Sequence, residues 1–123
     1  MQEVEHAFEA FIAAFNALDL ARFRACLAAD VSLFPPRSDA PRLIEGAAAV
    51  GAHFAAVFCA EAPAGPAIRP TNVRVTRLDE RAALVTFEFP RPHGSIGRRT
   101  LAFRLEGEDW KIAHVHASNT EGG

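Results

Sequence analysis

The stretch WKIAHVHAS, residues 110 to 118, decides how the rest of the sequence is interpreted. Its pattern predicts a β-strand, in which every second side chain points to the same face of a sheet. Strict alternation places His114 and His116 on one face with Trp110 and Ile112, and it places Val115 on the other face with the alanines. A face that carries a tryptophan and an isoleucine is expected to lie inside the domain. We therefore expect both imidazoles to project into a mostly apolar interior.

Length and composition point to one folded domain over residues 1–123, because half of the residues are hydrophobic. The formal net charge is −2, from 13 basic and 15 acidic residues, so we expect neither nucleic acid nor a membrane as a partner. The first twenty residues carry acids where a signal peptide carries bases, which predicts a cytoplasmic protein. Cys26 and Cys59 fall in predicted helices without a metal-binding or redox motif, which favours two buried free thiols.

The order of predicted elements indicates an α+β domain with helices on one face of a curved antiparallel sheet. Apolar residues at spacings of three and four predict helices, alternating residues predict strands, and prolines with glycines predict the turns. The expected helices are 2–17, 19–29 with Asp19 as N-cap, and 47–60; the expected strands are 31–34, 67–78, 82–89, 98–106 and 110–118; a loop covers 37–42 and a long turn covers 61–67.

Three stretches, FNALDLARFRACLAADVSLFPP (15–36), IEGAAAVGAHFAAVF (44–58) and TLAFRLEGEDWKIAHVHAS (100–118), resemble the nuclear transport factor two-like superfamily and, within it, the SnoaL-like small proteins. The closing W-K-I-x-H-x-H-x-S is also similar to the last strand of the association domain of calcium/calmodulin-dependent kinase. The resemblance implies a cone-shaped α+β barrel whose sheet wraps a central pocket. It also implies a homodimer formed through the outer face of the sheet. Enzymes, transport adaptors and assembly domains all share this fold, so the fold alone does not assign a function.

Within such a cone the inner surface would be apolar and aromatic with a few polar groups, which is typical of a small-molecule site. We expect Arg99 to bind the carboxylate or enolate of a small hydrophobic or weakly acidic ligand. No cofactor is expected. The residues predicted to contact the ligand are Arg99, Trp110, Phe11, Phe15, Phe34, Phe87, Leu101 and Phe103.

Several chemistries remain open for the histidines. Ketosteroid isomerase, which is similar in fold, needs a tyrosine and two carboxyl groups, whereas the aligned positions here hold Phe11, Pro35 and Leu101. The H-x-H pair would suit a metal, yet the inner strands offer no third ligand, so no metal site is predicted. His114 or His116 could instead act as a catalytic acid or base in a SnoaL-like isomerase, cyclase or hydratase. Two non-catalytic interpretations also remain open. In one, the histidines form a hydrogen-bonded polar patch; in the other, the chain is an assembly domain whose pocket is incidental.

Two further groups of charged residues have weaker interpretations. Asp30 is expected to cap or pair locally, although in SnoaL-like enzymes a pocket carboxylate can act as a base. The cluster Arg91, His93, Arg98 and Arg99 is expected at the mouth of the cavity, where it would attract an anion or form a solvated hairpin rim. Three acids of the first helix, Glu3, Glu5 and Glu9, are expected on its solvated face.

Overall fold

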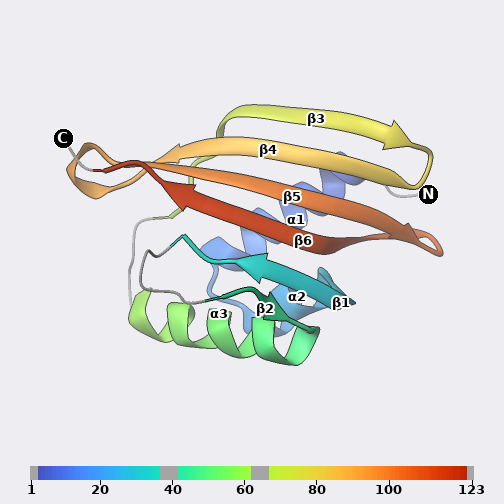
Figure 1. Cartoon of the computed structure of the whole chain (residues 1–123), viewed down its shortest axis with the longest axis horizontal. Coiled ribbons are helices and arrows are strands. Elements are labelled where there is room, and N and C mark those ends of the chain that lie inside the picture. Colours follow the sequence, from blue (N-terminus) through green and yellow to red (C-terminus); the bar gives the residue numbers. More distant parts are fainter. Residues whose placement is uncertain (1–2, 37–41, 62–66, 122–123) are drawn as a thin grey trace.

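Three α-helices cover one face of a six-stranded sheet in the computed structural model, which describes residues 3–36, 42–61 and 67–121. Figure 1 shows the sheet from its open side, with α1 behind it and α3 beside β2. The elements in chain order are α1 (Val4–Asn16), α2 (Leu20–Ala25), β1 (Leu27–Phe34), β2 (Ile44–Glu45), α3 (Ala47–Glu61), β3 (Thr71–Asp79), β4 (Ala82–Pro90), a short 3₁₀ turn (Pro92–Gly94), β5 (Ile96–Glu106) and β6 (Asp109–Asn119).

The strands lie in the order β2-β1-β6-β5-β4-β3. The four long strands β3 to β6 follow one another in antiparallel hairpins, as expected, because the connections at 80–81 and 107–108 are short. The first strand β1 pairs in parallel with the last strand β6, so the sheet is mixed rather than purely antiparallel. The α+β class expected from the sequence is confirmed.

The second helix ends earlier than the sequence predicts. Asp19 caps it as expected, because its side chain accepts a hydrogen bond of 3.1 Å from the backbone nitrogen of Arg22. The helix stops at Ala25, and residues 27–29 belong to β1. The backbone nitrogen of Ile112 on β6 donates to the carbonyl of Cys26 at 2.8 Å, so pairing with the last strand begins where the helix ends.

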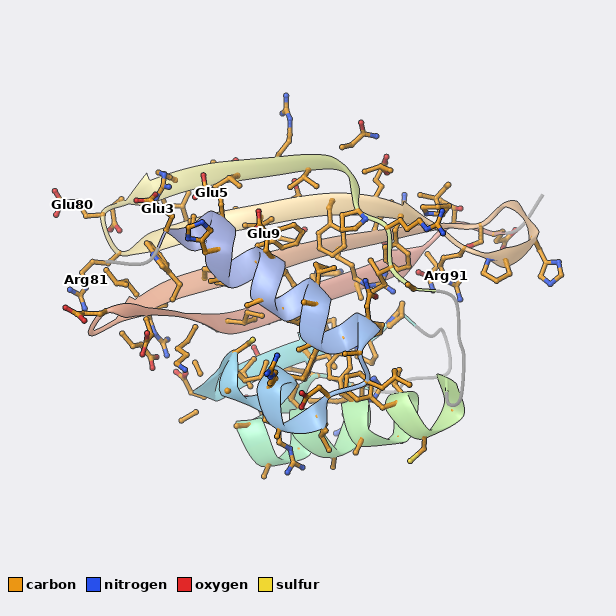
Figure 2. The ribbon with its side chains drawn as sticks, turned by 180° about the vertical axis from the view of Figure 1, so that it is seen from behind. Glu3, Glu5, Glu9, Glu80, Arg81 and Arg91 are labelled. Atoms are coloured by element: carbon orange, nitrogen blue, oxygen red, sulfur yellow. The ribbon has the colours of Figure 1, made fainter. Side chains whose placement is uncertain are left out.

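The two faces of the sheet have different surroundings, and we call them the helix face and the outer face. Rings of α1 pack directly on the helix face: the centroids of Phe8 and Phe87 lie 5.1 Å apart. Figure 2, seen from behind, shows α1 crossing this face. Glu3, Glu5 and Glu9 are exposed, as expected. The Arg77 guanidinium lies 3.0 Å from the carboxylates of Glu3 and Glu5, so it ties the start of α1 to β3.

Other expectations have mixed outcomes. Both cysteines are free, but Cys59 is exposed and Cys26 is only half-buried, so the prediction of two buried thiols is wrong. Most of the loop predicted at 37–42 and of the turn predicted at 61–67 lies outside the described residues. None of the described helices has the length and apolar character needed to cross a membrane.

Candidate functional site

A β-bulge in β6 reverses the faces expected for the two histidines. Phe103 pairs with Ile112, whereas Ala102 pairs with His114, so Ala113 is an extra residue without a partner on β5. One extra residue shifts the alternation by one, which moves every later side chain to the opposite face. Trp110 and Ile112 before the bulge are buried on the helix face, and so are Val115 and Ala117 after it.

The placement of His114 and His116 inside the cone is therefore wrong. His116 is exposed and His114 is half-buried, and both lie on the outer face in register with Thr100 and Ala102 of β5. Phe34, expected among the inner residues, is also on the outer face with 42% of its surface exposed. It pairs with His116 because β1 runs parallel to β6.

These outer residues form a small contact cluster of Ser32, Phe34, His114 and His116. The Ser32 hydroxyl and the Nδ1 atom of His114 share a hydrogen bond of 2.7 Å, and the Phe34 ring lies 5.5 Å and 5.3 Å from the two imidazole centroids. The pKa of His114 is below its ordinary value, chiefly because partial burial disfavours the cation and then because His116 lies close by. Each imidazole thus has neighbours on the outer face, not in an apolar cavity.

The residues expected to line the cone point to the helix face but pack against one another. Phe11 lies 5.1 Å from Phe23, which is fully buried, and Phe15 lies 5.3 Å from Phe58. Such close contacts between rings are those of a hydrophobic core. The other expected ligand contacts that are buried on this face are Trp110, Phe87, Leu101 and Phe103, each with no more than 5% of its surface exposed.

Arg99 is the polar group at the edge of this aromatic region. It lies in register with Phe87 and Ala117, which are both buried, so it belongs to the helix face. Its guanidinium carbon lies 4.8 Å from the centroid of the Phe89 ring, within the range of a cation–π contact. Gly97 makes room for that ring, because a Cβ atom at this position would collide with Phe89.

Hydrogen bonds hold the Arg99 guanidinium by one nitrogen only. Nη1 donates to the carbonyls of Arg98 and Ser118 at 3.0 Å and 2.9 Å, and to Oδ1 of Asn119 at 3.1 Å. Burial lowers the pKa of Arg99 to about 10, with a smaller contribution from the positive charge of Arg91. Arg99 is therefore still a cation at neutral pH, and within residues 3–36, 42–61 and 67–121 no carboxylate forms an ion pair with it.

Of the remaining members of the predicted arginine and histidine cluster, Arg91 lies close enough to lower the pKa of Arg99, whereas His93 and Arg98 point elsewhere. Arg91, which is labelled in Figure 2, lies near one end of the sheet and donates a hydrogen bond of 3.0 Å to the Ser95 hydroxyl. His93 is exposed in a left-handed backbone conformation with φ of 63°. Arg98 points to the outer face, where its Nε donates to the Ser118 hydroxyl at 3.0 Å.

Asp30 forms an ion pair, but its partner is 74 residues away on β5 and is not the local one expected. Its carboxylate lies 2.6 Å from the guanidinium of Arg104, which also contacts Glu106 at 2.7 Å. The pKa of Asp30 is lowered, first of all by the hydrogen bond from Arg104. The described part of the chain contains no group of three or more metal-binding side chains.

Comparison with known proteins finds one family and many structures of the same fold. The model of the SnoaL-like domain matches residues 4–120. The chain is similar to a "putative dehydratase from the NTF2-like family" of Streptomyces avermitilis, with 22% identity, a TM-score of 0.78, and coverage of 95% of this chain and 93% of the other. No curated protein matches the chain.

Two other solved structures of this fold are named for different functions. A "putative calcium/calmodulin-dependent protein kinase type II association domain" of Thiobacillus denitrificans is 26% identical, with a TM-score of 0.73 and coverage of 95% and 94%. A "putative ketosteroid isomerase" of Shewanella frigidimarina is 23% identical, with a TM-score of 0.75 and coverage of 92% of each chain. The fold is thus common to proteins with several described activities.

Proposed function

This chain belongs to the SnoaL-like domain family, and we propose that it binds a small hydrophobic carboxylic acid whose carboxylate pairs with Arg99. One observation carries the proposal. Arg99 is a partly buried cation beside aromatic rings, and no described carboxylate forms an ion pair with it. Removing water from an unpaired cation costs free energy, and an anionic ligand offsets that cost.

The free edge of the guanidinium suits a carboxylate. Nη1 makes the three hydrogen bonds to the protein, whereas Nε and Nη2 have no hydrogen-bond partner among the described residues. These two nitrogens lie on one edge of the planar group and donate in parallel, which matches the two oxygens of a carboxylate. The bonds from Nη1 hold this edge in place before a ligand arrives, so less side-chain entropy is lost on binding.

The apolar part of the ligand would lie against the aromatic residues next to Arg99. The Phe89 ring is under the guanidinium, and its centroid lies 6.2 Å from that of Phe87. Phe87 and Phe89 are only 3% and 7% exposed, so an apolar group of the ligand would complete the burial of rings that the protein already covers, and it would replace water beside the guanidinium. This combination favours a hydrophobic acid over a small polar anion.

Catalysis at this site does not involve the two histidines. His114 and His116 are on the outer face, whereas Arg99 is on the helix face, so the sheet separates them within one chain. A small molecule held on the Phe89 side of the Arg99 guanidinium therefore lies across the sheet from both imidazoles. A SnoaL-like isomerase, cyclase or hydratase that uses these histidines as acid or base has no geometric support, and we propose binding without a histidine-driven reaction.

The binding proposal is tested by calorimetric titration with phenylacetate, cinnamate and octanoate, and with phenylacetamide as the neutral equivalent. We expect at least one acid to bind and phenylacetamide to bind at least tenfold more weakly than phenylacetate. Arg99→Met should abolish acid binding. Arg98→Met is the matched control, because it removes a neighbouring charge from the other face of the same strand, and it should bind the acids as the wild type does. Failure of all three acids to bind, or equal binding by Arg99→Met, would falsify the proposal.

A second proposal concerns assembly, and it rests on the exposure of Phe34. This aromatic ring sits on the outer face in register with His116, and it contacts the rings of His114 and His116. An exposed ring on a sheet face supports contact with a second copy of the chain, which would bury the ring in a homodimer. Sedimentation equilibrium should give a dimer mass for the wild type and a monomer mass for Phe34→Asp; a monomeric wild type would contradict this arrangement.

A further inference from the structure

A hollow on the outer face arises from the register of four strands. Arg74, Thr86, Thr100 and His116 are successive partners across β3, β4, β5 and β6, so their side chains form one row on the same face. The two threonines are short, and they lie between the longer arginine and histidine. The resulting space has a volume of about 360 Å³. It extends to the neighbouring row on the same face, in which Glu88, Arg98 and Ser118 are partners.

The arginines of this hollow differ from the other arginines of the sheet. Arg77 and Arg104 are each paired with two carboxylates. Arg74 has no hydrogen bond or ion pair among the described residues, and Arg98 has only the Ser118 hydroxyl as a side-chain partner, at 3.0 Å. The chain thus neutralises the arginines around this hollow less than those elsewhere on the same sheet.

The single carboxylate that lines the hollow does not neutralise the two arginines. Glu88 accepts a hydrogen bond of 2.6 Å from the side-chain nitrogen of Asn72, and it forms no ion pair within the described chain. Two guanidiniums and one carboxylate leave the hollow with a net positive charge. The lining also supplies hydroxyl donors on both rows, from Thr86, Thr100 and Ser118.

We propose that this hollow binds the phosphate group of a small phosphorylated molecule. A phosphate monoester presents several tetrahedrally arranged oxygens and close to two negative charges, which suits two cations with several hydroxyl donors between them. A single carboxylate would use only part of this set. Glu88, at the edge of the hollow, would accept a hydrogen bond from the organic part of the molecule and thereby favour an ester with hydroxyl groups over free phosphate.

This site is separate from the acid site proposed at Arg99. Arg99 and Phe87 also border the hollow, but the Arg99 guanidinium turns to the Phe89 ring on the helix face. His116 borders the hollow and also contacts Phe34 on β1, so the contact with a second copy that we propose at Phe34 lies next to the hollow in the same row of the outer face. Charge at Arg74 and Arg98 can therefore be removed without altering the aromatic site.

The proposal is tested by calorimetric titration with glycerol 3-phosphate and with inorganic phosphate at constant ionic strength. We expect saturable binding of both, with the ester tighter. Arg74→Ala and Arg98→Ala should each raise the dissociation constant about tenfold or more, as for a lost charged hydrogen bond. Thr100→Val removes one donor without a charge and should raise it severalfold.

Arg104→Ala is the matched control, because it removes an arginine from the same face that already has carboxylate partners. It should leave phosphate binding unchanged. Arg74 and Arg98 are exposed, so their substitution should also leave the thermal unfolding temperature unchanged, which separates lost binding from lost folding. No saturable phosphate binding by the wild type, or an equal loss in Arg104→Ala, would overturn the proposal.

Discussion

Because of the bulge at Ala113, we expect substitutions at two neighbouring residues to have very different effects on stability. Val115 is 3% exposed on the helix face, while His116 is exposed on the outer face. Val115→Ala removes two buried carbon groups at about 0.8 kcal/mol each, and the cavity left behind adds to this, so we expect a loss of about 2 kcal/mol in the free energy of unfolding. His116→Ala removes only a surface ring that contacts Phe34, and we expect a loss of about 0.5 kcal/mol or less.

Urea and thermal unfolding measure both values. Trp110 is the only tryptophan, and it is buried, so its fluorescence reports on the packing of β6, with circular dichroism as a second probe. For a domain of this size, 2 kcal/mol corresponds to a fall of roughly 8 °C in Tm, against about 2 °C or less for His116→Ala. If His116→Ala were the more destabilising variant, the histidine would be inside the domain and β6 would have no bulge, which would refute the assignment of the two faces.

Three further predictions concern single residues. Gly97→Ala pushes a methyl group into the Phe89 ring, so it should lower the free energy of unfolding by about 1–3 kcal/mol in urea and weaken phenylacetate binding in calorimetry. The pKa of His114 is lowered on folding, so the folded state disfavours protonation of its ring. The free energy of unfolding should therefore be greatest above about pH 6.5 and fall as the pH drops below that value. Measurements of Tm across pH should show a smaller fall for His114→Asn. Asp19→Ala removes the cap of α2 and should cost about 1 kcal/mol in urea unfolding; an unchanged midpoint would show that the cap contributes nothing to stability.

Much of the fold could be predicted from local patterns. The apolar spacing of α1 and α3 and the alternation of β4 and β5 predicted the correct element types, because each of these elements buries one regular stripe or face. Residues 27–29 were assigned to the wrong element. Their conformation depends on pairing with β6, which is distant in the sequence, and helix periodicity does not report such pairing.

The candidate site could be predicted only in part. Arg99 lies on the helix face as expected, and its backbone partners and its contact with Phe89 appear only in three dimensions. The bulge did leave a signal, since Ile112 and Val115 are three residues apart whereas the buried residues of β5 alternate by two. Alternation alone could not decide between a bulge at Ala113 and two buried histidines.

The hollow near Arg74 had no signal in the sequence, because its residues come from four strands and are distant in the chain. Only the strand order and register bring Arg74 and Arg98 to one face beside the two threonines.

The amino-acid sequence by itself determined the order of helices and strands, the apolar stripes that form the core, and the family, because these depend on local spacing. Only the tertiary structure decided which face His114 and His116 occupy. A strand alternates strictly until one residue lacks a partner, and whether Ala113 lacks one depends on how β5 and β6 align along their whole length. The chemistry available at each face of the sheet follows from that single unpaired residue.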